Sequence, residues 1–166
     1  MTIWLVGMMG SGKSTIGRLL ASALQQEWID MDFQIEQVAG KSIPEIFQEE
    51  GEPAFRKLEK SVALSISKSS AVISTGGGVV KSKENQNIMK ENGLVIYLES
   101  SAEGLLKRLK GEMAHRPLLR GDNPQETLAQ LLNERQPMYL SAAHLVVDVE
   151  NRTPDQIVAE IMGKLE

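Results

Sequence analysis

The sequence contains no cysteine, so disulfide bonds, zinc sites built on thiolates and catalysis by a thiol are all excluded. Histidine is nearly absent as well, because only His115 and His144 occur, and their separation argues against a histidine-based metal cluster. Any bound metal is therefore expected to have oxygen ligands. No apolar run approaches the roughly 18 residues that a membrane-spanning helix needs, and the first residues resemble a strand rather than a signal peptide. We therefore expect a cytoplasmic protein without a membrane partner.

The sequence also lacks an excess of positive charge, since it has 18 basic and 22 acidic residues and a formal net charge of −4. Proteins that bind nucleic acids usually carry a basic surplus that neutralises phosphates. We therefore expect no nucleic-acid partner. A small anionic ligand remains compatible with this charge, because a few cations that converge in a cleft reverse the potential locally.

Short β-rich runs alternate with longer helical patterns along the 166 residues. This alternation predicts a single α/β domain over residues 1–166, with a five-stranded parallel sheet flanked by helices. The predicted strands are Ile3–Val6, Trp28–Asp30, Ala71–Ser74, Leu94–Leu98 and His144–Val147. Three helix starts carry capping patterns, which are Ser42 to Glu45, Asn123 to Glu126, and Thr153 followed by Pro154.

One segment fits neither pattern. Residues 111–123, "GEMAHRPLLRGDN", place two glycines, a proline and two arginines between helical patterns. Glycine and proline interrupt regular structure, so this segment is expected to be a mobile loop.

The segment "GMMGSGKST" follows the first predicted strand and precedes a helical pattern. Its spacing of Gly7, four residues, Gly12, Lys13 and Ser14 matches the phosphate-binding loop. In that loop backbone N–H groups surround an oxyanion, the lysine reaches the β- and γ-phosphates and the hydroxyl offers itself to Mg²⁺. The alternative is a glycine-rich turn without a ligand. The residues expected to bind the nucleotide are Gly10, Ser11, Gly12, Lys13, Ser14 and Thr15.

The sequence contains no Asn-Lys-x-Asp tetrapeptide of the kind with which Ras-type GTPases recognise guanine, so we expect ATP rather than GTP. Asp30 and Asp32 lie at the carboxyl end of the second predicted strand, the edge where open parallel sheets bind ligands. If the backbone is extended there, both carboxylates face the same side. One would support Mg²⁺ through water and the other would accept a proton from an attacking hydroxyl. Alternatively, they cap a helix that begins near Phe33.

Three consecutive glycines, Gly76–Gly78, follow the third predicted strand. Such a run costs conformational entropy on folding, and it makes sense where the backbone approaches a ligand or adopts a positive φ. A bare tight turn is the alternative. Many phosphate-loop ATPases have an aspartate at the end of the corresponding strand, where this sequence has Ser74.

Taken in order, several segments resemble shikimate kinase over essentially the whole chain. They are "GMMGSGKST", "DMD", "SIPEIFQEEGEPAFRKLE", "STGGGVV", "RPLL" and "NERQPMY". The resemblance implies a three-layer sandwich of the P-loop kinase type, with a lid at about residues 111–123. It also implies a monomer that uses ATP and Mg²⁺ to phosphorylate the 3-hydroxyl of shikimate on the route to chorismate and the aromatic amino acids.

The same resemblance implies roles for individual residues. Asp32 would bind the substrate hydroxyls and assist proton removal, and Asp30 would hold Mg²⁺ through water beside its direct ligand Ser14. Arg116, in the lid segment, would close over the phosphates, so the implied catalytic residues are Lys13, Asp32 and Arg116. The substrate carboxylate would be held by Arg56, Arg135 and the amides of Gly77 and Gly78. Adenine would lie between Arg108 and Pro154.

Each of these assignments has an ordinary alternative. Lone arginines on helices are usually solvated, and Arg120 would be able to share the task of Arg116. Glu59 either orients Arg56 or forms a common i,i+3 pair on a helix surface. Phe47, Phe55 and Tyr139 are interpreted as core packing. For the whole protein, the alternatives are a gluconate or nucleoside monophosphate kinase and a nucleotide-binding module without catalysis.

Overall fold

The computed structural model describes residues 1–110 and 123–166. A single sheet has five strands in the order β2-β3-β1-β4-β5, and all neighbouring strands are parallel. The strands are β1 (Ile3–Val6), β2 (Trp28–Asp30), β3 (Val72–Ser74), β4 (Leu94–Glu99) and β5 (Leu145–Asp148). The predicted five-stranded parallel sheet is confirmed: β1 and β2 have the predicted bounds, and the other three strands differ by one residue at one or both ends. The predicted lid, apart from Asn123, lies outside the described residues.

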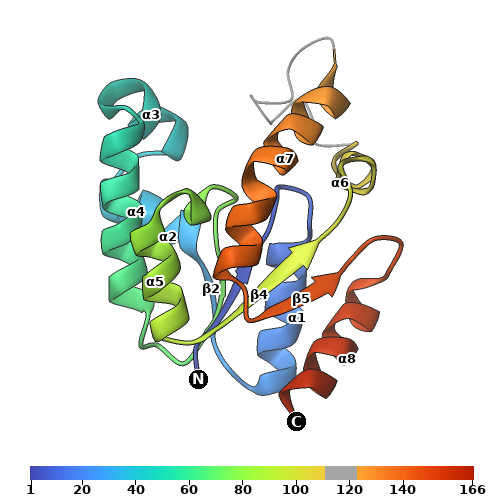
Figure 1. Cartoon of the computed structure of the whole chain (residues 1–166). Coiled ribbons are helices and arrows are strands. Elements are labelled where there is room, and N and C mark those ends of the chain that lie inside the picture. Colours follow the sequence, from blue (N-terminus) through green and yellow to red (C-terminus); the bar gives the residue numbers. More distant parts are fainter. Residues whose placement is uncertain (111–122) are drawn as a thin grey trace.

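Helices cover both faces of the sheet (Figure 1). One face packs against α1 (Lys13–Leu24) and α8 (Pro154–Leu165). The elements of the other face are α2 (Met31–Ala39), α3 (Ile43–Glu50), α4 (Glu52–Ile66), the 3-10 helix η1 (Val79–Lys81), α5 (Lys83–Glu91), α6 (Ala102–Leu109) and α7 (Pro124–Ala142). The fold is therefore the predicted three-layer sandwich.

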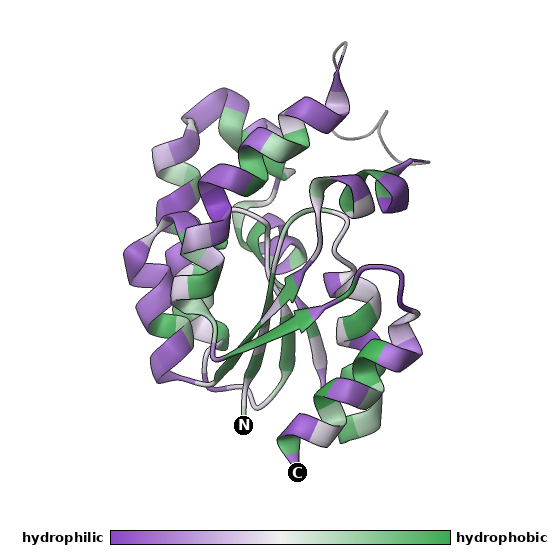
Figure 2. Ribbon diagram, turned by 45° about the vertical axis from the view of Figure 1, so that its right-hand side comes forward, coloured by the Kyte–Doolittle hydropathy of each residue, from purple (hydrophilic) through white to green (hydrophobic). Residues whose placement is uncertain are grey.

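The central strand explains why both faces need a cover. Side chains of β1 alternate between the two faces, so Ile3 and Leu5 pack toward α1 and α8 while Trp4 and Val6 pack toward the other layer. All four are buried. Figure 2 shows hydrophobic residues concentrated in the strands and polar residues on the outer turns of the helices.

The three capping patterns are confirmed. The side chains of Ser42, Asn123 and Thr153 each accept a hydrogen bond from the backbone N–H three residues later. Thr153 also completes a capping box, because its own N–H donates to the side chain of Gln156 at 2.9 Å. In the described part of the chain, no helix combines the length and the apolar character that crossing a membrane requires.

Because all strands are parallel, their carboxyl ends meet at one edge of the sheet, the upper edge in Figure 1. Strand β3 lies between β1 and β2. The phosphate-loop motif after β1, the acidic pair after β2 and the three glycines after β3 therefore converge there. Both chain termini lie at the opposite edge.

Candidate active site

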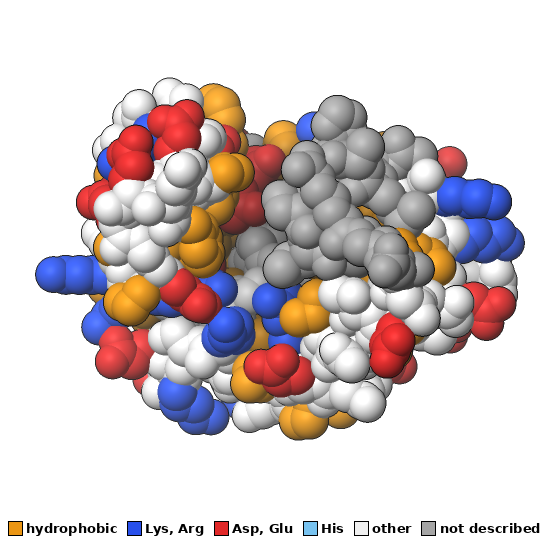
Figure 3. Space-filling model, turned by 90° about the horizontal axis from the view of Figure 1, so that it is seen from above, with side chains coloured by type: hydrophobic (Ala, Val, Ile, Leu, Met, Phe, Trp, Pro, Cys, Tyr) orange, Lys and Arg blue, Asp and Glu red, His pale blue; other side chains and the backbone are white. Residues whose placement is uncertain are grey.

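A cavity of about 530 Å³ opens at this edge of the sheet. Figure 3 looks down on it, and acidic and basic side chains gather around a hollow in this face of the molecule. The lining residues come from the phosphate loop, the acidic pair, the end of β3 and α6, and they are Met9, Gly10, Gly12, Lys13, Ser14, Thr15, Asp30, Asp32, Ser74, Thr75, Gly76, Gly77 and Arg108.

The phosphate-loop motif forms a turn that only glycine adopts readily. Gly10 and Gly12 have φ angles of 82° and 94°, and Gly12 is the N-cap of α1. Because Gly12 has no side chain, it leaves the first N–H groups of α1 available to an anion. Lys13 Nζ donates to the carbonyl oxygens of Gly7 at 2.6 Å and Met8 at 3.0 Å, so the ammonium group lies over the loop. The loop thus presents a charged group and amides to the same cavity.

Ser74 takes a structural part that the sequence did not reveal. Its hydroxyl donates to the backbone oxygen of Lys13 at 2.6 Å and accepts from Trp28 Nε1 at 2.9 Å. Ser74 has no carboxylate and was not expected to bind a metal, but its hydroxyl connects the end of β3 to the start of α1. The sequence shows that Ser74 replaces the aspartate found in many phosphate-loop ATPases. It does not show this tether, which depends on the packing of β2 against β3.

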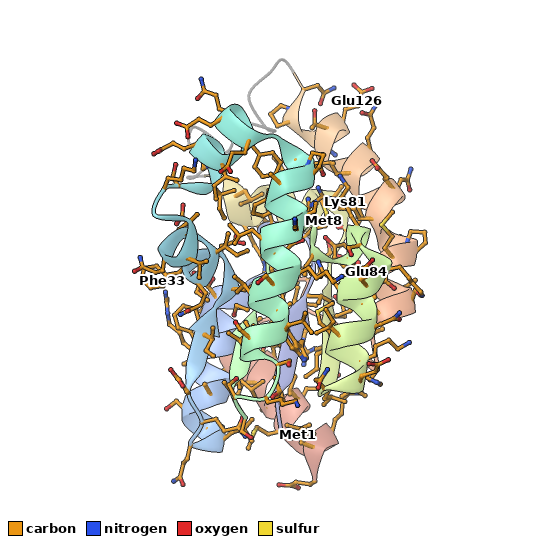
Figure 4. All side chains as sticks on the ribbon, turned by 90° about the vertical axis from the view of Figure 1, so that its left-hand side faces the viewer. Met1, Met8, Phe33, Lys81, Glu84 and Glu126 are labelled. Atoms are coloured by element: carbon orange, nitrogen blue, oxygen red, sulfur yellow. The ribbon has the colours of Figure 1, made fainter. Side chains whose placement is uncertain are left out.

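Asp30 and Asp32 lie at the predicted edge of the sheet, but the backbone between them is not the extended one that we expected. Strand β2 ends at Asp30 and α2 begins at the next residue, so the backbone is not extended through Asp32. Asp30 is the N-cap of α2 and accepts from the backbone N–H of Phe33 at 3.3 Å. Both carboxylates nevertheless line the cavity, so the cap and the site are not exclusive alternatives. The exposed ring of Phe33 lies at the outer side of α2 (Figure 4).

The electrostatic surroundings make Asp32 a better base than an ordinary aspartate. Burial raises the pKa of the Asp32 carboxyl, and the neighbouring negative charge of Asp30 raises it further. The cations Lys13 and Arg56 oppose this rise without cancelling it. A carboxylate with a raised pKa holds an abstracted proton more firmly, which suits a proton acceptor.

The three glycines are explained by close approach of side chains. A Cβ on the first glycine of Gly76–Gly78 would lie 2.8 Å from Asp32 Oδ1, one on the second 3.3 Å from Arg135 Nη1, and one on the third 2.6 Å from Arg56 Nη2. None of the three has a positive φ. The turn therefore has no side chains of its own because three others, from α2, α7 and α4, pack directly against its backbone.

Arg56 is held in place by a buried carboxylate. Its Nη1 donates to Glu59 Oε1 at 2.9 Å and to the backbone oxygen of Gly78 at 3.0 Å. Glu59 is only 1% exposed, so this i,i+3 pair is not the surface pair that we considered. Asn85 Nδ2 also donates to Glu59 Oε1, at 3.0 Å. Burial raises the pKa of Glu59, and the Arg56 guanidinium opposes the rise.

Around Arg56, the charged network extends to the surface. Lys81, labelled beside α4 in Figure 4, donates to Glu52 Oε1 at 2.8 Å. The same carboxylate oxygen accepts from Arg56 Nε at 3.4 Å. The lysine ammonium lowers the pKa of Glu52, and this exposed carboxylate therefore stays ionised and helps to orient the arginine.

Arg135 reaches the glycine turn from α7. The residue is 9% exposed and lies one helical turn before Tyr139, on the same face of the helix. Tyr139 is packed as predicted, since its ring stacks on Tyr97 with centroids 4.9 Å apart. Its hydroxyl also donates to the backbone oxygen of Gly77. This second contact was not predicted from the sequence, because its partner is a backbone atom of a distant segment.

Arg108 connects the main cavity with a second one of about 370 Å³, which Pro154 also lines. The guanidinium of Arg108 donates to the backbone oxygens of Val149 and Arg152, the second at 3.3 Å. These contacts fix its position at the end of α6. The two residues expected at adenine are therefore brought to one surface.

Some predicted residues do not join the site. Arg116, Arg120 and His115 lie outside the described residues. His144 Nδ1 accepts a hydrogen bond from the backbone N–H of Val95 at 3.0 Å, away from the cavity. Phe47 and Phe55 pack together with ring centroids 4.7 Å apart, but Phe47 is 38% exposed, so its assignment to the core was wrong.

The cavity offers oxygen donors that suit Mg²⁺. The hydroxyl of Ser14 and the carboxylates of Asp30 and Asp32 line the same space. Mg²⁺ is usually held by one or two protein oxygens together with waters and substrate phosphates. Within residues 1–110 and 123–166, no group of three or more histidine or acidic side chains gathers as a dedicated metal cage would. These three residues thus offer oxygen donors to a metal ion in the cavity.

The strand order, with a phosphate-loop motif after the central strand and charged side chains after its neighbours, is that of the P-loop kinase class. A family model described as shikimate kinase (SKI) matches residues 9–166. Shikimate kinases from Hahella chejuensis and Vibrio parahaemolyticus are 44% and 43% identical, over 97% and 99% of this chain and 84% and 95% of theirs. The chain belongs to the shikimate kinase family.

Solved structures agree with this assignment. A shikimate kinase from Acinetobacter baumannii in complex with shikimate has a TM-score of 0.92 and 36% identity, and the match covers 99% of this chain and 92% of that chain. The shikimate kinase from Aquifex aeolicus has a TM-score of 0.82 and 38% identity, with 99% and 96% covered. The predicted family and fold class are thus confirmed.

Proposed function

We propose that this protein transfers the γ-phosphoryl group of ATP to the 3-hydroxyl of shikimate, giving shikimate 3-phosphate and ADP in the pathway to chorismate and the aromatic amino acids. The observation that carries the proposal is the arrangement around the glycine turn. Asp32, Arg56 and Arg135 all pack against Gly76–Gly78, while the phosphate loop lies across the same cavity. Of these three residues Asp32 lines the cavity itself, and the two guanidiniums lie against the glycine turn at its side. A base and two cations thus surround one turn beside a phosphate site, as an acceptor that carries both hydroxyls and a carboxylate requires.

The carboxylate of the substrate is bound between Arg56 and Arg135, because a guanidinium pairs with a carboxylate through two parallel hydrogen bonds. The amides of Gly77 and Gly78 complete this end of the site. Glu59 and Glu52 fix the direction of the Arg56 guanidinium in advance. Such preorganisation lowers the cost of binding.

ATP lies with its phosphates on the loop, where residues 10–15 donate backbone amides and hydroxyls. Lys13 Nζ leaves the carbonyls of the loop for the β- and γ-phosphates, and adenine lies between Arg108 and Pro154. Ser14, and Asp30 through water, would hold Mg²⁺, which would supply positive charge to the phosphate oxygens. Arg116, which lies outside the described residues, would add a further positive charge at the phosphates.

In the transfer itself, the 3-hydroxyl oxygen attacks the γ-phosphorus as the bond from that phosphorus to the bridging oxygen of ADP breaks. The proton of the hydroxyl passes to Asp32, whose raised pKa supports this part. Catalysis then depends on alignment and on compensation of the phosphate charge by Lys13 and Arg116.

The experiment that tests the proposal supplies the purified protein with ATP, Mg²⁺ and a panel of acceptors, and measures release of ADP. We expect turnover with shikimate and none with gluconate or a nucleoside monophosphate. Turnover with one of those acceptors and none with shikimate would replace the proposal by another small-molecule kinase. Binding of ATP with no acceptor-dependent turnover would indicate a nucleotide-binding module.

We further propose that the chain acts as one domain and as a monomer in the cytoplasm, without a nucleic-acid or membrane partner. The single sheet between two apolar clusters supports one domain. The net charge of −4 supports the absence of a nucleic-acid partner. Sedimentation of the purified protein at the mass of one chain, 18.3 kDa, is the expected result for the monomer.

A further inference from the structure

The backbone carbonyls of the glycine turn, Gly76–Gly78, are all held by hydrogen bonds. The first accepts from the N–H of Val79 at 3.2 Å, and the third from Arg56 Nη1 and the N–H of Lys81, both at 3.0 Å. The second carbonyl, that of Gly77, accepts from the hydroxyl of Tyr139. The middle peptide of the turn is therefore fixed by a side chain from another helix.

Fixing a carbonyl also fixes an amide. The C=O of Gly77 and the N–H of Gly78 belong to one planar peptide unit, and no peptide bond of the described residues is cis. In a trans peptide these two groups point in opposite directions. The direction of the Tyr139 hydroxyl therefore determines the direction of the Gly78 N–H. Neither this amide nor that of Gly77 donates to any group in residues 1–110 and 123–166.

We propose that Tyr139 is a positioning residue that aims the amide of Gly78 at the substrate carboxylate. The inference rests on the proposed function and adds to it a residue without direct contact to substrate. Arg135 and Tyr139 share one face of α7, and both act on the same turn, the guanidinium beside Gly77 and the hydroxyl on its carbonyl. Helix α7 thus both supplies Arg135 and, through Tyr139, orients the Gly78 N–H, and both groups are proposed to bind the substrate carboxylate.

Tyr139 is well suited to this part. Its side chain is fully buried and its ring stacks on Tyr97, which prevents rotation away from the turn. Burial raises the pKa of Tyr139 to about 12, although the charge of Arg135 and a side-chain hydrogen bond between Arg135 and the Tyr139 hydroxyl oppose the rise. The hydroxyl therefore keeps its proton at neutral pH and remains a donor.

The chain contains a matched control. It has two tyrosines, and Tyr97 is buried against the first in the same stack. Within the described part of the chain, the hydroxyl of Tyr97 has no hydrogen-bond partner. Removing one hydroxyl or the other therefore deletes the same atom from the same stack, and only Tyr139→Phe releases the Gly77 carbonyl and the contact of the hydroxyl with Arg135.

The test compares steady-state kinetics of Tyr139→Phe, Tyr97→Phe and the parent protein. For Tyr139→Phe we expect the KM for shikimate to rise about tenfold, which is the scale of one hydrogen bond. Its kcat and its KM for ATP should stay within about twofold of the parent, since the phosphate loop is untouched. Tyr97→Phe should keep the parental KM for both substrates.

A second substrate links the effect to the carboxylate. With an analogue in which the carboxylate of shikimate is reduced to an alcohol, the difference in kcat/KM between Tyr139→Phe and the parent should fall below about twofold. Introducing 4-aminophenylalanine at position 139, which keeps a donor, should restore the KM for shikimate. If Tyr139→Phe does not fold, 4-methylphenylalanine at this position fills the volume of the hydroxyl without donating and takes its place.

Equal KM values for shikimate in the two phenylalanine variants would overturn the inference, as would an equal loss with the alcohol analogue. Failure of the donor-bearing replacement to restore KM would overturn it too. A parent protein with no turnover of shikimate is a different result, because it removes the proposed function and the inference together.

Discussion

The molecule has two glycine-rich turns, on neighbouring strands of one sheet, and the glycines serve different purposes in each. In the phosphate loop after β1, Gly10 and Gly12 adopt φ angles of 82° and 94°, so the backbone conformation itself requires them. In the turn after β3, no glycine of Gly76–Gly78 has a positive φ. There the requirement is space, because Asp32, Arg135 and Arg56 each press against one glycine.

The difference teaches how the two parts of the proposed site are built. The part proposed for the nucleotide, the nucleotide end, is made mostly of backbone from one continuous segment, with Lys13 as its charge. The part proposed for the acceptor, the acceptor end, is a glycine turn against which side chains from α2, α4 and α7 pack, and of these three side chains only that of Asp32 lines the cavity. A change in the first turn should therefore act on ATP, and a change in the second on shikimate.

The largest effect is expected at the nucleotide end. Lys13→Ala removes the charge over the phosphate loop, and kcat should fall about 10²- to 10³-fold, as when a preorganised donor to a transition state is lost. Steady-state assays of ADP release measure the change. Lys83→Ala, which removes an exposed lysine from the start of α5, is the control and should keep the parental kcat. An unchanged kcat in Lys13→Ala would contradict the assignment of the loop.

A sharper comparison replaces one glycine in each turn. Gly10→Ala forces a side chain into a left-handed conformation that costs about 1–2 kcal/mol, with its Cβ 2.7 Å from Leu109 Cγ. We expect a lower Tm and a higher KM for ATP.

Gly77→Ala strains no backbone angle but displaces Arg135, so the KM for shikimate should rise about tenfold at a nearly parental Tm.

Gly163→Ala is the matched control for both glycine variants. Position 163 lies in α8 with no atom within 4 Å of the added Cβ. Alanine favours a helix over glycine by about 1 kcal/mol, so the Tm should rise and both KM values should stay unchanged. If Gly10→Ala and Gly77→Ala affected the same substrate, the distinction between the two turns would be wrong.

The smallest effect concerns stability and pH. The folded-state pKa of Asp32 is raised above its ordinary value of 3.8, so folding favours the protonated form. The free energy of unfolding therefore declines as pH rises from 3.8 through the folded pKa, and the loss persists at higher pH. Asp32→Asn removes the buried charge, so its Tm at pH 7 should exceed that of the parent.

The gain from Asp32→Asn should shrink as the pH is lowered toward 3.8, where the parental carboxyl is also protonated. Thermal melting across this range measures it. Asp155→Asn, at an exposed carboxylate in the first turn of α8, serves as the control and should give no gain in Tm. A Tm of Asp32→Asn equal to or below the parent's at pH 7 would show that Asp32 is not destabilised by burial.

Much of the nucleotide end could be predicted from the sequence, because its signals are local. The loop motif is contiguous, and the strand before it and the helix after it are apparent from apolar patterning. The parallel sheet could be predicted because short β-rich runs alternate with longer helical patterns along the chain. Asp30 and Asp32 line one cavity with the phosphate-loop motif, but the helix that begins at Met31 replaced the extended backbone on which that argument relied.

The acceptor end could be predicted only through family resemblance. Arg56 and Arg135 are far apart in sequence, and neither has a local signal, since their shared contact with the glycine turn arises from packing of α4 and α7. Glu59 looked like a surface partner and is buried. Single hydroxyls such as those of Ser74 and Tyr139 leave no pattern at all, because their partners are backbone atoms of distant segments.

The tether at Ser74 has a practical consequence. The indole of Trp28 is joined through this one hydroxyl to the backbone oxygen of Lys13, and the guanidinium of Arg18 lies 4.4 Å from the centre of its ring. The other tryptophan, Trp4, is fully enclosed within the protein. The chain therefore carries its own fluorophore two hydrogen bonds away from the phosphate loop, and we expect binding of a nucleotide to change its intrinsic emission, which requires no label.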